Sequence, residues 1–124
     1  MSDLAAFRAA VEAGDHAGMV ATLAPEPVLR SPVTFKPFEG REAVSRLFGI
    51  LLEVFEGFRY TDAFEADGRA ALIFEARVGD RELQGLDLFR FDGDGKIVEL
   101  TVMVRPASGL MALGEAVGAR LQAA

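Results

Sequence analysis

The second half of the chain carries three short glycine-containing turns, and these divide it into four stretches that are each long enough for a β-strand. The turns are Asp67-Gly68, Gly79-Asp80 and Asp92-Gly93-Asp94-Gly95. Glycine supplies the positive φ angle that a tight reversal requires, and two strands joined by a short turn must run antiparallel. We therefore predict an antiparallel meander, with strands at roughly 58–66, 70–78, 82–91 and 96–105.

Turn length also predicts the register of this meander. If Gly79-Asp80 is a two-residue turn, Leu72 lies opposite Asp87, and if residues 92–95 form a four-residue loop, Leu100 faces Asp87 from the other side. Successive side chains of a strand point to opposite faces, so one face of the sheet is predicted to be apolar. Its other members are Phe74, Ala76, Leu83, Phe89, Phe91, Val98, Val102 and Val104.

Asp87 stands among these apolar residues, which makes it the leading candidate for a functional side chain. An ionised carboxylate is costly to remove from water, so it must be hydrogen-bonded, hold its proton unusually tightly, or line a cavity that a ligand enters. A structural carboxylate, satisfied by a backbone amide or by Tyr60 or Ser31, is the alternative to a cavity-lining one. The apolar neighbours of Asp87 favour the cavity.

The opposite face of the meander has a mixed character. Its predicted neighbours are Arg77 with Glu82, Glu75 with Gln84, Arg90 with Ile97, and Thr101 with Leu86, interspersed with Ile73, Leu88 and Met103. Such a mixture is typical of a solvated or subunit-contacting surface. We therefore predict a homodimer that forms through this outer sheet face.

Two short helices are predicted at the N-terminal end. Residues 4–13 carry apolar side chains at helical spacing and stop at Gly14, a residue type that commonly ends helices. Asp15 is suited to cap a second helix, which Pro25 and Pro27 are expected to end. The chain is therefore expected to begin with two helices before any strand.

Three further elements complete the prediction. Residues 28–34 are expected to form a short edge strand, because Pro32 cannot donate a hydrogen bond within a sheet. A long helix follows Gly40, and its apolar stripe is expected to pack as core rather than contact a ligand, including at Phe48, Leu52 and Phe55. A last helix at about 108–122, capped by Ser108, is expected either to close a pocket or to reach a partner subunit.

Composition limits the class of protein. With 124 residues, 51% of them hydrophobic, we expect a single domain over residues 1–124 whose core covers about 4–106. A net charge of -6 without a basic cluster argues against a nucleic-acid partner. A single histidine, His16, and no cysteine argue against a metal site, and we expect no cofactor. The N-terminus is not basic and no apolar run is long enough to span a membrane, so we expect a cytoplasmic protein with no membrane partner.

The order of these elements resembles the NTF2-like superfamily, and within it the SnoaL-like and ketosteroid-isomerase-like branch. The likeness spans residues 7 to about 105 and rests on three stretches, which are 13–20 (AGDHAGMV), 31–33 (SPV) and 86–97 (LDLFRFDGDGKI). It implies an α+β cone, in which a curved, mostly antiparallel sheet wraps around the N-terminal helices and the long helix, with an extra C-terminal helix. Unrelated sites occur on this scaffold, so the fold does not assign an activity.

The resemblance also implies roles for individual positions. Asp87 matches the carboxylic acid that the isomerases keep protonated, so that it donates a hydrogen bond to the developing enolate oxygen. Phe7 stands where that family has a tyrosine, and Ser31 stands where it has the proton-shuttling aspartate. Steroid isomerisation by that mechanism is therefore not expected. The limonene-epoxide-hydrolase branch is not expected either, because Arg77 is predicted on the outer face and Gly79 replaces the first required aspartate.

We therefore predict that the chain binds a small, largely apolar molecule in an enclosed pocket, with Asp87 as the main polar group. The alternative is an enzyme that uses Asp87 as a lone general acid/base, in the manner of a polyketide cyclase or an isomerase, on a small hydrophobic substrate. The expected ligand contacts are Phe7, Ser31, Tyr60, Leu72, Phe74, Phe89, Leu100 and Val102.

Overall fold

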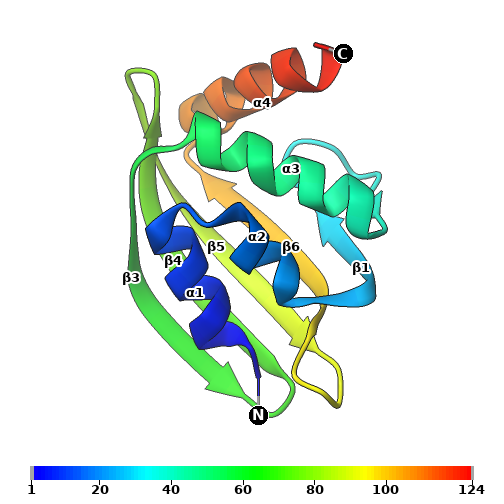
Figure 1. Ribbon diagram of the computed structural model, residues 1–124. Helices are drawn as coiled ribbons and strands as arrows, with labels where there is room; N and C mark the ends of the chain where they lie inside the picture. Colours follow the sequence, from blue (N-terminus) through cyan, green and yellow to red (C-terminus); the bar gives the residue numbers. More distant parts are fainter. Residues whose placement is uncertain (1, 124) are drawn as a thin grey trace.

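The computed structural model describes residues 2–123 and contains one curved sheet with helices packed against it (Figure 1). The strand order is β2-β1-β6-β5-β4-β3, so the four strands of the predicted meander lie next to one another. The helices are α1 (Leu4–Ala13), α2 (His16–Ala21), α3 (Arg41–Val54) and α4 (Ala107–Gln122). The strands are β1 (Leu23–Arg30), β2 (Phe38–Glu39), β3 (Glu56–Ala66), β4 (Arg69–Val78), β5 (Arg81–Phe91) and β6 (Ile97–Arg105).

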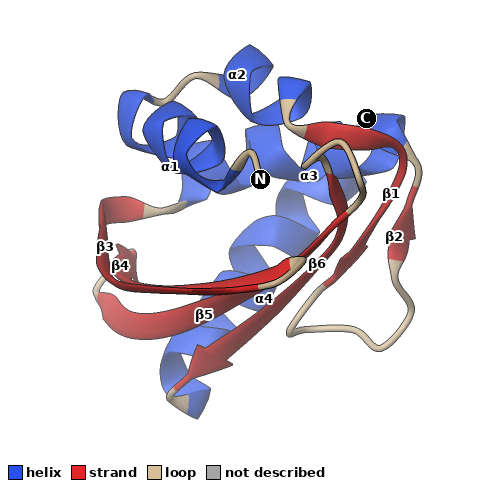
Figure 2. Ribbon diagram, turned by 90° about the horizontal axis from the view of Figure 1, so that it is seen from below, coloured by secondary structure: helices blue, strands red, loops and turns tan. Residues whose placement is uncertain are grey.

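The sheet is strongly curved, and α1, α2 and α3 lie on its concave side (Figure 2). The C-terminal helix α4 packs beside α3 and against β4, β5 and β6. This arrangement is the α+β cone that the sequence predicts, with the extra helix at its end. Within residues 2–123, no helix combines the length and the apolar character needed to cross a membrane.

The two N-terminal helices meet where the sequence predicts. Gly14 closes α1 with a φ of 66°, a left-handed conformation that glycine adopts at little cost. The side chain of Asp15 accepts a hydrogen bond of 3.0 Å from the backbone N–H of Gly18 and so caps α2. Phe7 of α1 and Met19 of α2 are buried beneath the two helices.

The strand after α2 differs from the prediction in length and position. We expected the second helix to continue toward the prolines and an edge strand at 28–34; instead, β1 begins at Leu23 and lies inside the sheet, parallel to β6 and with β2 on its other side. The pairing of β1 with β6 is interrupted between Leu23 and Val28. The two prolines lie in this interruption, where a missing N–H donor does not break the ladder.

The register between β4 and β5 is the one predicted from a two-residue turn. Leu72 lies opposite Asp87, and Phe74 lies opposite Gly85. The predicted pairs on the outer face are also present, namely Arg77 with Glu82 and Glu75 with Gln84. A short turn therefore predicts both the pairing and the face of every residue on these two strands.

The register between β5 and β6 is shifted by two residues from the prediction. Val102, not Leu100, lies opposite Asp87. One residue of the shift comes from the loop, which spans 92–96, and the other comes from a β-bulge that follows it. A shift of two keeps Leu100 and Val102 on the concave face. The bulge, however, turns Ile97 into the core, where it is fully buried, and not onto the outer face as expected.

Asp92 accounts for the longer loop. Its carboxylate accepts hydrogen bonds from the backbone N–H groups of Asp94 (2.9 Å) and Lys96 (3.0 Å), which organises the reversal around this side chain. The outer-face neighbours are shifted accordingly and are Arg90 with Glu99, Leu88 with Thr101, and Leu86 with Met103.

The last helix begins at Ala107, and the predicted cap at Ser108 is wrong. Pro106 occupies the N-cap position, and no side chain caps the helix. Near its start, Gly109 packs directly on β5, since a Cβ atom there would lie 2.7 Å from the Cβ of Leu83. This close approach brings the following turns of α4 over the concave side of the sheet, next to α3.

Candidate functional site

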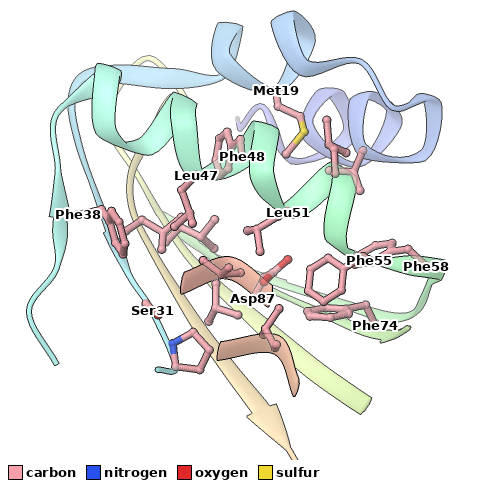
Figure 3. A pocket seen from close by; sticks show the side chains of 18 of the residues that line it. Met19, Ser31, Phe38, Leu47, Phe48, Leu51, Phe55, Phe58, Phe74 and Asp87 are labelled. Carbon is pink, nitrogen blue, oxygen red and sulfur yellow. The ribbon is translucent and has the colours of Figure 1, made fainter. Parts of the chain in front are cut away.

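A cavity of about 440 Å³ lies between the concave face of the sheet and the helices (Figure 3). Its volume is in the range of small-molecule binding sites. Most of the residues that line it are apolar and come from α1, α3, α4, the loop after β1 and the strands. The polar side chains in the lining are Glu12, Ser31, Thr34, Tyr60 and Asp87.

Asp87 is the buried carboxylate of this cavity. It is only 7% exposed, and the residues opposite it on the neighbouring strands are Leu72 and Val102. No hydrogen-bond or ion-pair partner for its carboxylate lies among residues 2–123, and its oxygens are open to the cavity. Burial therefore raises the pKa of Asp87 from 3.8 to about 7. Near neutral pH, the neutral and the ionised forms are both populated.

Ser31 lies in the loop that follows β1 and also lines the cavity. Its hydroxyl oxygen accepts a hydrogen bond of 3.0 Å from the backbone N–H of Val33, so the loop itself orients this side chain. In Figure 3, Ser31 lies at the far side of the cavity from the aromatic rings that adjoin Asp87. Ser31 therefore does not serve as the structural hydrogen-bond partner of Asp87.

Tyr60 on β3 adds a second titratable group to the lining. Burial raises the pKa of its phenol, and the negative charge of Asp87 raises that pKa further. The guanidinium of Arg8 lies over the ring, with its Cζ 5.4 Å from the ring centroid. The phenol is therefore neutral at physiological pH, where it can donate a hydrogen bond.

Three phenylalanines form one end of the cavity, next to Asp87 (Figure 3). The rings of Phe58 and Phe74 are stacked with their centroids 4.7 Å apart. Phe55 meets Phe74 edge-on at 5.5 Å. These contacts hold the three rings in fixed orientations and give this end of the cavity an aromatic wall beside Asp87.

Six of the eight predicted contacts line the same cavity as Asp87, and these are Phe7, Ser31, Tyr60, Phe74, Leu100 and Val102. The other two do not. Leu72 and Phe89 are fully buried in the core behind the cavity wall, and the ring of Phe89 packs against that of Phe7 with a centroid distance of 5.1 Å. Sequence alternation assigns them to the correct face, but their contacts are with protein.

Several cavity residues were not predicted as ligand contacts. Phe48, Leu52 and Phe55, which we expected to be core, do pack in or against the core, but they also line the cavity beneath α3. The last helix contributes Leu113, Gly114, Val117, Gly118 and Leu121. Spacing of three and four residues puts these five positions on one face of α4. That spacing is the sequence signal from which the contribution of α4 to the cavity lining could have been predicted.

The fold and the cavity define the class of protein as an NTF2-like cone with an internal apolar pocket. The family model described as the SnoaL-like domain matches residues 4–100. The chain therefore belongs to the SnoaL-like family, in agreement with the resemblance of its sequence. No curated protein matches the chain.

Two solved structures are similar over nearly the whole chain. A steroid delta-isomerase from Pseudomonas aeruginosa is 44% identical, with a TM-score of 0.92 over 97% of this chain and 89% of that chain. An uncharacterized protein with a cystatin-like fold from Silicibacter pomeroyi is 30% identical, with a TM-score of 0.91 over 95% of this chain and 84% of that chain. A de novo designed protein with a curved β-sheet shares the fold at 17% identity, with a TM-score of 0.72 over 92% of this chain and 96% of that chain.

Proposed function

We propose that this protein binds a small, largely apolar molecule in the cavity, with one polar group of the ligand hydrogen-bonded to Asp87. The observation that carries the proposal is a buried carboxylate that has no protein partner among residues 2–123 and opens onto an apolar space. A buried polar group without a partner is costly, so a ligand that supplies one gains affinity there.

The protonation state of Asp87 indicates which polar group of a ligand can bind to it. Below pH 7 its carboxyl is largely neutral and can donate a hydrogen bond. A carbonyl oxygen accepts that bond without bringing charge into the cavity. A ligand carboxylate would instead place a second acid beside Asp87, where like charges repel. We therefore expect a neutral oxygen-containing ligand, such as a ketone.

Binding of 2-undecanone, a neutral ketone with a long apolar chain, tests the proposal. Titration calorimetry at pH 6 should detect binding to the native chain. Asp87→Ala should weaken it roughly tenfold, since it removes the hydrogen bond to the carbonyl. Asp80→Asn alters an exposed acid in a turn and should have no effect. Absence of binding, or equal binding by Asp87→Ala, would contradict the proposal.

A second candidate function is proton transfer by Asp87, favoured by its pKa of about 7. In an allylic isomerisation, the carboxylate would remove a proton from the carbon between a carbonyl and a double bond and return it two carbons further along, with no net change in composition. The 44% identical relative is a steroid delta-isomerase. The position that the resemblance assigns to a second acid is Ser31, which leaves Asp87 as the buried acid for this chemistry.

A β,γ-unsaturated steroid ketone tests this candidate directly, because isomerisation produces a conjugated enone whose ultraviolet absorbance is easily followed. Turnover by the native chain that is lost in Asp87→Asn would support the enzyme. Equal rates for the native chain and Asp87→Asn would exclude Asp87 as its general acid/base, while leaving the binding proposal to be judged on its own experiment.

We also propose that two copies of the chain associate through the convex face of the sheet. Met103 is 51% exposed there and pairs with Leu86, so apolar surface lies at the centre of this face. Met103→Glu should convert a dimer into a monomer in light-scattering measurements. Met111→Glu, at an exposed methionine of α4, should leave the mass unchanged. A native chain that is monomeric at high concentration would contradict the proposal.

A further inference from the structure

The concave face of the sheet is organised in rows of paired residues, and Asp87 lies one row away from a glycine. Leu72 and Asp87 form one pair, Phe74 and Gly85 form the next, and Ala76 and Leu83 form the one after. Phe74 belongs to the cavity lining, whereas Ala76 and Leu83 lie in the core beyond it. The cavity therefore ends at the row of Phe74 and Gly85.

The ring of Phe74 occupies the space that any other residue at position 85 would fill. A Cβ atom built on Gly85 would lie 2.0 Å from Cζ of Phe74 and 2.4 and 2.7 Å from its two Cε atoms. The ring thus extends from β4 across the backbone of β5. Phe74 is 1% exposed and also lines the cavity, so it is both a core residue and part of the cavity wall.

Neighbouring rings prevent Phe74 from moving aside. Phe58 stacks on it at 4.7 Å, and Phe55 meets it edge-on at 5.5 Å. Figure 3 shows these three residues together at one end of the cavity, with Ser31 and Phe38 at the opposite end and Asp87 between, close to the aromatic end. A ligand bonded to Asp87 therefore has room on one side only.

We propose that Phe74, whose ring fits only because residue 85 is a glycine, is a specificity-determining residue. It restricts the site to ligands whose polar atom lies at or next to one end of the molecule. The apolar body of such a ligand extends from Asp87 toward Ser31 and Phe38. A molecule with its polar atom at the centre would need space where the ring of Phe74 lies. This inference rests on the proposed function, and it names the class of ligand that the same site accepts.

Two isomeric ketones test the restriction, because they have the same composition and differ only in the carbonyl position. The native chain should bind 2-undecanone, with a carbonyl near its end, roughly tenfold more tightly than 6-undecanone, with a central carbonyl. Titration calorimetry at pH 6 measures both affinities. Phe74→Ala should reduce the ratio to about one or two, chiefly by improving the binding of 6-undecanone.

A milder variant and a control distinguish a change in ligand specificity from a loss of folding stability. Phe74→Leu removes less volume and should reduce the ratio partly. Phe89→Leu is the control, since Phe89 is an equally buried phenylalanine of the adjoining strand that does not line the cavity. It should lower the melting temperature without changing the ratio of the two affinities.

Gly85→Ala tests the contact itself. The added methyl group collides with the ring of Phe74, so this variant should lower the melting temperature and weaken the binding of both ketones. In the double variant Phe74→Ala with Gly85→Ala, the methyl group has space. Gly85→Ala should therefore lower the melting temperature of the Phe74→Ala variant far less than it lowers that of the native chain.

The outcomes separate the two proposals. Equal affinity of the native chain for both ketones, or a ratio unchanged in both Phe74 variants, would overturn the role of Phe74 while the dependence of binding on Asp87 could still hold. If neither ketone binds, or if Asp87→Ala binds 2-undecanone as tightly as the native chain does, the proposed function fails and the restriction by Phe74 fails with it.

Discussion

Asp87 and Leu72 lie directly opposite each other on β5 and β4, with the leucine fully buried and the carboxyl group facing the cavity. A leucine side chain offers no hydrogen bond in place of the water that a carboxylate loses. The free energy of ionising Asp87 in the folded chain is therefore much higher than in the unfolded chain.

The first prediction is that folding stability falls as pH rises through the window set by Asp87. Its pKa is raised from 3.8 to about 7, so between these values the folded chain binds the proton more tightly than the unfolded chain does. The contribution of Asp87 to stability is fully present below pH 3.8 and is lost by about pH 7, a loss of roughly 4 kcal/mol. Urea unfolding at pH 5 and pH 8 measures most of it.

Asp87→Asn is the control for this pH dependence, because the amide does not ionise. The variant should lose most of the decline between pH 5 and pH 8 and should be more stable than the native chain at pH 8. An identical pH dependence in the variant and the native chain would show that other groups cause the decline.

The second prediction concerns the affinity for a neutral ketone. A carbonyl oxygen accepts a hydrogen bond only from protonated Asp87, so binding is linked to the proton. Affinity for 2-undecanone should be constant well below pH 7 and fall by up to tenfold per pH unit above it. Asp87→Asn keeps an N–H donor and should bind with no such dependence. Affinity that rises with pH in the native chain would refute this hydrogen-bond assignment.

The third prediction is that Tyr60 resists ionisation. Burial, followed by the negative charges of Asp87 and Glu12, raises the pKa of its phenol above the ordinary value of 10.0. Tyr60 is the single tyrosine of the chain, so the ultraviolet absorbance of tyrosinate reports this residue alone. Phenolate absorbance should develop only together with alkaline unfolding. A reversible transition near pH 10 in the folded chain would place the hydroxyl in water.

The fourth prediction contrasts two glycines at positions with different backbone requirements. Gly118 is inside α4, and a Cβ atom there meets nothing within 4 Å. Gly118→Ala should therefore stabilise the chain by about 0.5–1 kcal/mol through helix propensity. Gly14 has a φ of 66°, so Gly14→Ala should destabilise it by about 1 kcal/mol. Thermal unfolding measures both, and equal effects of the two substitutions would contradict the argument.

The fold was predictable to the extent that it depends on local signals. The turn at Gly79-Asp80 predicts the β4–β5 register, and Gly14 and Asp15 predict the junction of α1 and α2. The position of β1 was not predictable in this way. Its parallel pairing with β6 joins residues far apart in the chain, and its two prolines are tolerated only because the ladder is interrupted around them.

The residues of the candidate site were likewise predictable only in part. Alternation along β5 predicts that Asp87 faces the apolar side, and the structure agrees. Alternation also selected Phe89, which packs on Phe7 and does not line the cavity. The apolar stripe of the long helix assigned Phe55 to the core and gave no sign that Phe55 also lines the cavity. An apolar residue has the same pattern in the sequence whether its neighbour is protein or empty space.

The sequence by itself determined the meander, the helix ends around Gly14, and the presence of an acid on an apolar face. Each of these follows from the conformational preference or the alternation of residues near one another in the chain. Tertiary structure alone decided where the cavity lies and where it ends, as the ring of Phe74 over Gly85 shows. Empty space is what remains after α3, α4 and the curved sheet have packed, so it depends on contacts between distant residues.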